Sequence, residues 1–457
     1  MNKIKEKILQ IKDRICDKVK NMKEKPKAQP DIEDKLSGVE IIDDDSVITI
    51  PQKKKMKRWK KGLIICGSVV AGIIVILVSV FMFLRISGKS SLYGRATSER
   101  PNLNRENQVE ENIIGSLDID PENMDNIIVI GDDDTEETGG NTSGESHGTK
   151  ENQGGSSKED SNKLSFEGAG AESGYDVIYN GEKYVYNEDM ITLLFLGIDT
   201  KEAVKPAEDG VSGGQSDALF LLVLNPHTNI MDIIAIHRNS IALVDIYDKN
   251  GNYTGTGYTQ ICLQHAYGGG MEKSNEMTKN SVSRMLYDLP IHSVTSINMG
   301  AVPELNDSVG GITLNSLETF EADGYSFIEG QQVKLKGDNA YTYVHYRNMY
   351  VSDSAGMRLN RQKQYITSFI NTALAQVKND IGKVVDVYNI ISKYVVTDLS
   401  IDEMTYLASE LISYKFGGIY SIEGELDKNP KWKYERYNLN QDALYEMLID
   451  KFYEKVE

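Results

Sequence analysis

Residues 62–84, GLIICGSVVAGIIVILVSVFMFL, form a run of 23 residues without one charged side chain. As an α-helix rising about 1.5 Å per residue, this run is about 34 Å long, enough to cross a hydrocarbon core of about 30 Å. Buried helices of soluble proteins are shorter and carry a polar stripe, and the apolar part of a signal peptide is shorter and nearer the N-terminus. The run therefore predicts one transmembrane helix, and no later segment is long and apolar enough to predict another.

The charges around this run predict its direction. The basic stretch KKKMKRWKK, at 53–61, directly precedes it, whereas basic residues are sparse immediately after it. The positive-inside rule then places residues 1–61 in the cytoplasm as a basic tail and the C-terminal domain outside the cell. Residues 85–457 hold 32 Lys and Arg against 57 Asp and Glu. Such an acidic outer portion argues against nucleic acid as a partner, because phosphate backbones attract basic surfaces. We expect a single-pass protein of the cell membrane.

Residues 94–165 contain no Phe, Trp or Tyr and are rich in Gly, Ser, Asp and Glu. Such a chain buries too little apolar area to offset its ordering entropy, so we predict a disordered acidic tether at 86–170. A flexible chain of this length spans roughly 50 Å, which would hold the folded portion away from the membrane. The apolar patch NIIVI, at 126–130, indicates a short strand or a docking motif within it.

The composition becomes globular from about residue 175. Near-continuous apolar runs at 190–199, 218–225 and 230–237 predict strands that are buried on both faces. A further strand is expected at 293–299, and helices at 272–289, 337–346, 354–378, 380–394 and 402–414. Strands mixed with helices predict a layered α/β/α domain with a mixed central sheet. We place this domain at 175–375 and interpret 376–457 as a helical C-terminal extension, either part of the fold or an appended cap.

Two aspartates stand at the ends of predicted strands. Asp199 ends the first apolar run, and Asp217 opens the second. If these strands are neighbours, both carboxylates lie at one edge of the sheet, where they can hold a divalent cation together with phosphate oxygens. Taken singly, each aspartate can equally cap a turn or a helix.

Arg238 directly follows the third apolar run, in the sequence AIHRNS. Its planar guanidinium suits phosphate or carboxylate, and a surface salt bridge is the alternative. The end of the strand fixes its position, and we expect its substitution to affect stability as little as at an ordinary surface site. Replacing Arg238 with Ala or Lys should then change the free energy of unfolding by less than about 1 kcal/mol.

A third cluster lies in YVHYRNMYVSDSAGMRLNRQKQ, at 343–364. Its candidate binding residues are His345, Arg347, Asp353, Arg358 and Gln362. On a helix, the last two lie one turn apart on one face. So many arginines in an acidic region indicate an anionic, phosphorylated ligand, and a solvated helix face is the alternative. The sequence contains no P-loop and no His-Glu-x-x-His motif.

Seven segments together resemble the LytR-CpsA-Psr (LCP) family of cell-envelope proteins. In order, they are LLFLGID (193–199), SDALFLLVLNP (216–226), IIAIHRNS (233–240), QHAYGGG (264–270), PELNDSVGGI (303–312), LKGDNAYTYVHYR (335–347) and RLNRQKQYI (358–366). Several motifs in the right order are far more specific than any one of them. The resemblance covers roughly residues 190–375.

This resemblance implies a function. Members of the family transfer a polyprenyl-pyrophosphate-linked glycopolymer, such as teichoic acid or a capsule-like polysaccharide, onto peptidoglycan. Their polyprenyl chain lies in an apolar channel, and arginines with Mg²⁺ hold the pyrophosphate. The implied partners are therefore the lipid-linked glycopolymer, peptidoglycan and membrane lipid. The implied reaction is phosphoryl transfer, which depends on positioning and on charge neutralisation.

The resemblance also assigns roles to individual residues. Asp199 and Asp217 match aspartates of the metal and pyrophosphate site, and Arg238 matches the arginine of the family's Pro-Arg-Asp motif. Arg347 and Arg358 match pyrophosphate-binding arginines. The implied catalytic set is Arg238, Arg347, Arg358 and Asp217. Gln362 matches a further polar contact with the substrate.

The sequence departs from the family pattern in three places. His237 and Asn239 flank the motif arginine where the family usually has Pro and Asp. His345 replaces the first arginine of an Arg-x-Arg pair. The aspartate expected three residues before Arg358 is Ala355, so Asp353 could act in its place. These departures leave open a non-catalytic regulator or scaffold that binds the same lipids, and hydrolysis of the pyrophosphate by water.

Overall fold

The computed structural model describes residues 78–103, 113–120, 124, 127–130, 176–380 and 382–456. The predicted cytoplasmic tail at 1–61 and residues 62–77 of the predicted transmembrane helix lie outside the described residues. Within the described ranges, no helix combines the length and the apolar character needed to cross a bilayer. The chain divides into the units Met1–Val69 and Val70–Glu457, and every described residue belongs to the second.

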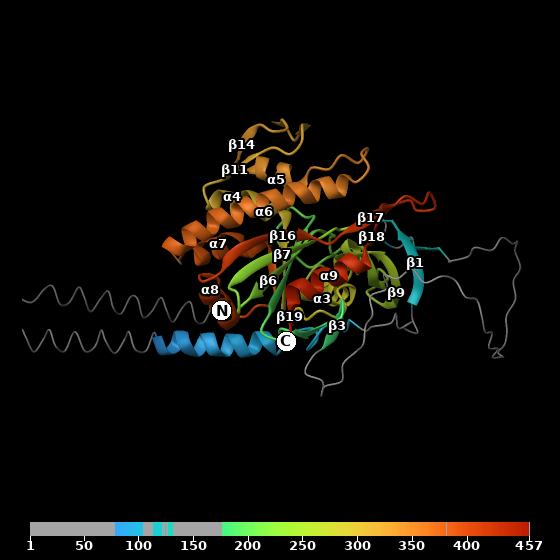
Figure 1. The fold of residues 1–457 in the computed structure, drawn as a ribbon. Helices are drawn as coiled ribbons and strands as arrows, with labels where there is room; N and C mark the ends of the chain where they lie inside the picture. Colours follow the sequence, from blue (N-terminus) through green and yellow to red (C-terminus); the bar gives the residue numbers. More distant parts are fainter. Residues whose placement is uncertain are drawn as a thin grey trace, which may run out of the picture. The chain divides into compact units, whose positions relative to one another are not determined.

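A mixed six-stranded sheet lies at the centre of the described unit (Figure 1). In spatial order its strands are β15 (Val395–Thr397), β10 (Ser293–Asn298), β5 (Ile191–Ile198), β6 (Ser216–Asn225), β7 (Ile230–Ile236) and β16 (Lys415–Ser421). β5, β6 and β7 form an antiparallel meander, while β10 runs parallel to β5 and β16 runs parallel to β7. The three predicted apolar runs are confirmed as β5, β6 and β7, whose residues are almost all buried.

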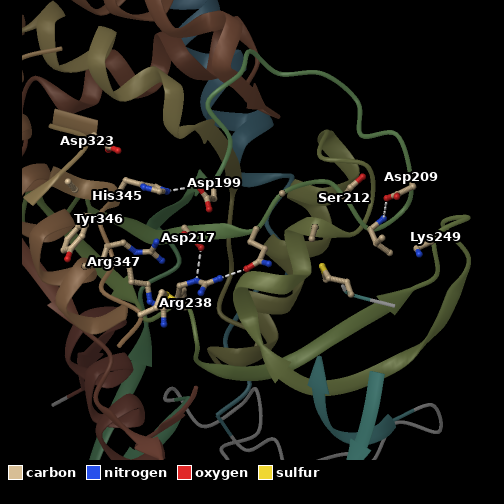
Figure 2. A pocket seen from close by; sticks show the side chains of 18 residues that line it. Asp199, Asp209, Ser212, Asp217, Arg238, Lys249, Asp323, His345, Tyr346 and Arg347 are labelled. Atoms are coloured by element: carbon tan, nitrogen blue, oxygen red, sulfur yellow. Dashed lines mark hydrogen bonds and ion pairs between the residues drawn. The ribbon is translucent and has the colours of Figure 1, made fainter. Parts of the chain in front are cut away.

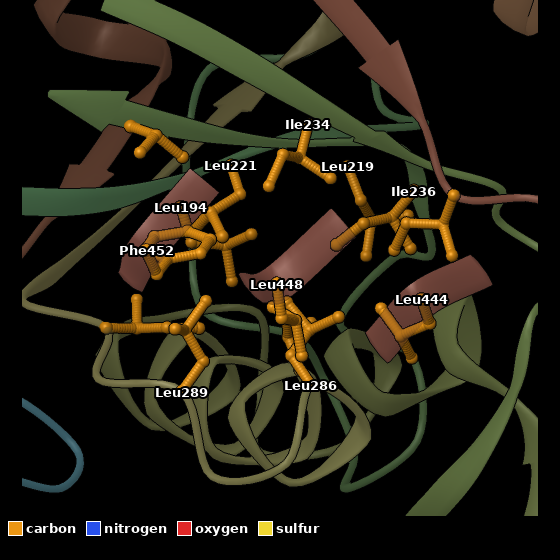
Figure 3. Packing of buried hydrophobic residues seen from close by; sticks show 14 of the residues in the cluster. Leu194, Leu219, Leu221, Ile234, Ile236, Leu286, Leu289, Leu444, Leu448 and Phe452 are labelled. Atoms are coloured by element: carbon orange, nitrogen blue, oxygen red, sulfur yellow. The ribbon is translucent and has the colours of Figure 1, made fainter. Parts of the chain in front are cut away.

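Helices cover both faces of this sheet, which confirms the predicted α/β/α layering. α3 (Glu272–Met285) and α9 (Gln441–Phe452) cover one face, where Leu221 and Ile236 pack with Leu286, Leu444 and Phe452 (Figure 3). The other face is covered by α6 (Ser354–Asn379) and α8 (Ile401–Leu411). Each fully buried leucine stabilises the fold by about 1.5–3 kcal/mol relative to an exposed one.

The remaining elements surround these layers. Three small sheets pair β11 (Ile312–Asn315) with β14 (Gln332–Leu335), β12 (Phe320–Ala322) with β13 (Tyr325–Phe327), and β17 (Gly424–Asp427) with β18 (Arg436–Leu439). A three-stranded sheet joins β3 (Val177–Tyr179), β4 (Glu182–Tyr186) and β19 (Tyr453–Lys455). The other helices are η1 (Ile261–Ala266), η2 (Met299–Ala301), α4 (Val302–Ser308), α5 (Asp338–His345), α7 (Gly382–Ile391) and η3 (Ser392–Tyr394).

The predicted tether at 86–170 is wrong for its described part. Residues 78–93 form one helix that packs on α8, where Ser87 donates to Asp402 at 2.8 Å and Ser91 donates to Glu403 at 2.7 Å. Gly88 permits this close approach, because a Cβ at this position would collide with the carbonyl of Asp402. Packing rather than aromatic content orders this helix: Leu92 is fully buried in the core between α8 and the sheet.

Farther along the predicted tether, two segments form strands. β1 (Ile113–Ile119) pairs in parallel with β9 (Tyr253–Gln260), which pairs with β8 (Ile241–Tyr247), and β2 (Ile127–Ile130) pairs antiparallel with β1. Leu117 and Ile119 are fully buried in the core that this four-stranded sheet shares with α3. The strand expected from NIIVI is therefore confirmed as β2, and residues 131–175 lie outside the described residues.

The C-terminal region 376–457 is more than a helical extension. It supplies β15 and β16, the two edge strands of the central sheet, and α9, which covers one face together with α3. Short strands with half-exposed side chains, such as β16, carry no long apolar run in the sequence. The boundary that we predicted at 375 therefore falls within helix α6 and does not separate two domains.

Candidate active site

The antiparallel meander brings three strand ends to one edge of the central sheet. β5 ends where β6 begins, with Ile198 paired to Ser216, and β7 returns to end at the same edge. Asp199 follows β5, Asp217 lies at the start of β6, and Arg238 follows β7. The predicted juxtaposition of the two aspartates at one sheet edge is therefore confirmed.

The second group of candidate residues reaches this edge from α5 and α6. His345 is the last residue of α5, Arg347 lies in the connecting loop, and Arg358 lies in the second turn of α6. The loop ends at Asp353, which has a left-handed backbone (φ 58°) and accepts a hydrogen bond from the Gly356 backbone N–H at 3.2 Å. This cap fixes where α6 begins and hence where Arg358 lies.

The two groups meet in a cavity of about 810 Å³ (Figure 2). Six of the predicted site residues line it: Asp199, Asp217, Arg238, His345, Arg347 and Arg358. Its other polar lining includes Asp209, Ser212, Gln215, Lys249 and Asp323. Three guanidinium groups and an imidazole in one cavity make a binding site for an anion.

Asp217 is the link between two of the arginines. Its Oδ1 lies 2.9 Å from Nε of Arg238 as an ion pair, and its Oδ2 accepts a hydrogen bond from Nη1 of Arg358 at 2.5 Å. Arg238 also donates from Nη2 to Gln215. Burial opposes ionisation of Asp217, but the two guanidinium groups outweigh it and hold the pKa of Asp217 below its ordinary value. Asp217 is therefore a buried carboxylate that orients two cations.

Arg358 also has unused hydrogen-bonding capacity. Its Nη2 is buried and has no hydrogen-bond partner among the described residues. A buried charged donor without a partner is costly, and an anionic ligand would remove that cost. This is the strongest local sign that the cavity is built to hold an anion.

Arg347 is held by a different acid. It donates from Nη2 to Oε2 of Glu435 at 2.8 Å and from Nε to Oγ of Ser354 at 2.9 Å. Burial lowers the pKa of Arg347, and the neighbouring charges of Arg238 and Arg358 lower it further. The three guanidinium groups therefore lie close enough to repel one another, and a negatively charged ligand would reduce that repulsion.

The two predicted metal ligands, Asp199 and Asp217, fit a metal site only in part. Asp199 is half-exposed, and its Oδ1 lies 2.9 Å from Nε2 of His345, while both oxygens of Asp217 face arginines. Among the described residues, no group of three His, Cys, Asp or Glu side chains is arranged to hold a metal ion. Mg²⁺ commonly binds one or two carboxylates together with phosphate oxygens of a ligand. Asp199 fits that pattern, and Asp217 fits it less well.

Gln362 and Asp353 do not line the anion cavity. Gln362 lines a second cavity of about 420 Å³, which lies between α6 and the sheet and is almost entirely apolar. Its Oε1 is buried without a hydrogen-bond partner among the described residues. Arg358 and Gln362 are one turn apart on α6, so this helix places a cation in one cavity and an amide in the other.

Asp353 instead faces His237 from the helix cap. Its Oδ1 lies 3.6 Å from Nε2 of His237. Burial lowers the pKa of His237 to about 4 in spite of this carboxylate, so the ring is uncharged at neutral pH. A role for Asp353 in substrate binding stays a prediction.

The profile of the LytR_cpsA_psr family matches residues 141–450 of this sequence. The chain belongs to the LytR_cpsA_psr family. This match extends well beyond the segment at 190–375 that carried the resemblance, and it includes β15, β16, α8 and most of α9 in the C-terminal region. The strands β1 and β2 precede the matched residues.

Two curated relatives of the LytR_cpsA_psr chain are polyisoprenyl-teichoic acid–peptidoglycan teichoic acid transferases named TagU. The Bacillus subtilis protein is 31% identical over 229 residues, which cover 50% of this chain and 66% of that protein. The Bacillus licheniformis protein is 30% identical over 240 residues, which cover 52% of this chain and 69% of that protein. The crystal structure of Bacillus subtilis TagU is 24% identical, with a TM-score of 0.39, and covers 59% of this chain and 99% of that one.

Sequence reasoning missed two polar residues that hold the arginines of this LytR_cpsA_psr site. Gln215 precedes β6 and accepts from Arg238, and a polar residue beside a strand end could have suggested it. Glu435 lies 88 residues after its partner Arg347, in a segment without any local motif. No sequence signal marks it, because only the tertiary fold brings β18 to the site.

Proposed function

We propose that this protein is a membrane-anchored phosphotransferase that attaches polyprenyl-pyrophosphate-linked glycopolymers to peptidoglycan. The observation that carries the proposal is the pairing of a cavity lined by three arginines with an apolar cavity beside it. The first suits a pyrophosphate, and the second suits an isoprenoid chain. Neighbouring residues, Asp217 and Ala218, line the two cavities, so one lipid pyrophosphate could occupy both. The TagU relatives support the same reaction class.

The chemistry follows from the charges. A hydroxyl group of a peptidoglycan sugar attacks the phosphorus that carries the glycopolymer, and the bond to the lipid phosphate breaks. The lipid monophosphate leaves with the electron pair of that bond and takes up the proton of the hydroxyl group. Arg238, Arg347 and Arg358 neutralise the charge that develops on the phosphoryl oxygens. Asp217 keeps two of these arginines in place throughout.

Mg²⁺ is the proposed cofactor. Asp199 would hold it together with phosphate oxygens of the substrate, and Asp217 would act mainly through the arginines. When bound, the metal would add positive charge beside the pyrophosphate. Transfer that continues at the full rate after chelation of divalent cations would contradict this assignment.

The test of the proposed reaction uses the full chain in mild detergent. It is mixed with a lipid-linked glycopolymer, Mg²⁺ and peptidoglycan oligomers, and the covalent product is identified by mass spectrometry. We expect glycopolymer joined to peptidoglycan through a phosphodiester. Release of free glycopolymer phosphate would indicate hydrolysis, and binding of the lipid without turnover would indicate the regulator or scaffold that His237, Asn239 and His345 leave open.

The proposed location is the cell membrane, with the N-terminus in the cytoplasm and the C-terminal domain outside. The support is the uncharged run at 62–84 and the basic stretch before it. A cysteine placed at Ser156 should react with an impermeant thiol reagent in intact cells, and one placed at Lys35 should react only after lysis. The reverse pattern would show that the orientation is wrong.

Filling the apolar cavity should separate binding of lipid from binding of the pyrophosphate group. Ala373 on α6 lines this cavity, so Ala373→Phe would place a ring where the isoprenoid chain is expected. We expect about tenfold weaker binding of polyprenyl phosphate, because that much lost affinity corresponds to about 1.4 kcal/mol. Affinity for inorganic pyrophosphate should stay within about twofold.

The matched control is Ala375→Phe, which makes the same change two residues along α6 at an exposed position. Equal loss of lipid affinity in both variants would argue that the cavity is not the lipid site. Fluorescence titration with a labelled polyprenyl phosphate measures the lipid affinity of the wild type and of both variants.

A further inference from the structure

Glu435, the last residue before β18, accepts a hydrogen bond from Arg347 of the anion cavity. We propose that Glu435 is a positioning residue, which holds Arg347 in the orientation needed for the ligand. Its effect on transfer rests on the proposed function, whereas its effect on anion binding does not. Glu435 lies outside the domain that the sequence predicted at 175–375.

Glu435 joins three separate parts of the site. Its Oε2 accepts hydrogen bonds from Nη2 of Arg347 at 2.8 Å and from Nδ2 of Asn239 at 3.2 Å. Its Oε1 accepts from the backbone N–H of Asp353 at 3.2 Å. These donors belong to the loop after α5, the turn after β7 and the cap of α6, so one carboxylate fixes their mutual positions.

Arg347 needs a carboxylate of its own because both oxygens of Asp217 already pair with other arginines. Arg238 and Arg358 each face one oxygen of Asp217, which leaves Arg347 to find another counter-charge. The Arg347 side chain is only 16% exposed, and two other guanidinium groups lie close enough to lower its pKa. Without Glu435, Arg347 would be repelled from this position toward solvent.

Asn239 allows the carboxylate of Glu435 to lie at this position, because the Asn239 side chain is uncharged and donates a hydrogen bond to it. In the family's Pro-Arg-Asp motif an aspartate follows the arginine, and in this chain the position holds an amide that donates to Glu435. An aspartate there would bring two like charges together across the same gap. The negative charge beside the arginines is thus provided by the C-terminal region instead of by the turn after β7.

The backbone around Glu435 is itself held firmly. The Tyr437 N–H donates to the carbonyl of Asn239 at 2.9 Å, and Nε2 of Gln260 donates to the Glu435 carbonyl at 3.1 Å. From the other side, Asp118 of β1 accepts from the Lys433 N–H at 2.9 Å, and Arg436 donates to the Leu117 carbonyl at 2.8 Å. A strand that precedes the family match therefore supports the segment that positions Arg347.

The test is a double-mutant cycle on binding of inorganic pyrophosphate, measured by calorimetry with the full chain in detergent. The proteins are the wild type, Glu435→Gln, Arg347→Ala and the double variant, with Glu425→Gln as the control for loss of one exposed acid on β17. We expect Glu435→Gln to weaken binding at least about fivefold when Arg347 is present and less than about twofold when it is absent. Glu425→Gln should change binding less than about twofold.

Each other result would overturn the proposal. If Glu435→Gln weakens pyrophosphate binding equally with and without Arg347, Glu435 has only a general structural role. If it strengthens binding equally in both, Glu435 acts only by repelling the anion at long range. No change, or a wild type that does not bind pyrophosphate, would exclude the positioning role directly. Transfer is measured in parallel: if the wild type shows the cycle but no transfer, the proposed function fails and the role of Glu435 stands.

Discussion

Replacing Asp217 with asparagine should lower the free energy of unfolding by about 3–5 kcal/mol and abolish transfer. The carboxylate is 6% exposed and pairs with Arg238 and Arg358, whose side chains are 11% and 4% exposed. Asparagine has nearly the same shape but no charge, so two buried cations would lose their counter-charge. The arginines would then repel each other, and the anion site would lose its geometry.

Chemical unfolding of the full chain measures this effect, with Asp386→Asn as the control at an exposed position on α7. The pKa of Asp217 is lower in the folded protein than its ordinary value of 3.8. Its contribution is therefore fully present above pH 3.8 and is lost as the pH falls through the folded-state pKa. The difference between the wild type and the variant should shrink in acid. Equal free energies of unfolding for the two proteins at neutral pH would show that the charge of Asp217 does not stabilise the buried arginines.

The second large effect is expected from Arg238→Lys, which should slow transfer by about 10²–10³-fold. Arg238 faces Asp217 through Nε and Gln215 through Nη2, and a guanidinium fork can make both contacts while it binds a phosphate. A single ammonium group keeps the charge but cannot make this set of contacts. Initial rates of transfer measure the loss.

Arg284→Lys is the matched control, because Arg284 pairs with Asp245 outside the cavity. If both variants retain the wild-type rate, Arg238 does not take part in the reaction. The expectation from the sequence that Arg238 behaves as a surface site needs correction, because its side chain is mostly buried and pairs with a buried acid. Arg238→Ala should cost about 1.5–3 kcal/mol of stability, less than loss of Asp217, since Arg358 remains to neutralise the acid.

The central meander and its helices could be predicted because buried elements need apolar residues in a regular pattern that is visible in the sequence. β5, β6 and β7 are covered on both faces and therefore appear as unbroken apolar runs. Their antiparallel order places Asp199 and Asp217 at one edge, which the positions of these residues at strand ends already suggested. A local density of cations in the sequence located Arg347, in the loop after α5, and Arg358, on α6.

Other features depend on contacts that no local pattern records. β1 and β9 contain glycine and polar residues, and β1 pairs with β9, a strand more than 130 residues away. The role of Asp217 as a partner of arginines could not be read from its place on a strand. Glu435 has no sequence signal at all, because the fold alone brings it to Arg347.

The packing of the helix at 78–93 on α8 has a mechanical consequence. Arg85 pairs with Glu410, Arg95 pairs with Glu403, and Leu92 is buried between them and the sheet. With the membrane anchor proposed above, residues 85–93 would add no free length to the connection between the domain and the bilayer, because they already pack on α8. The range over which the cavity could search for acceptors would be shorter by that length.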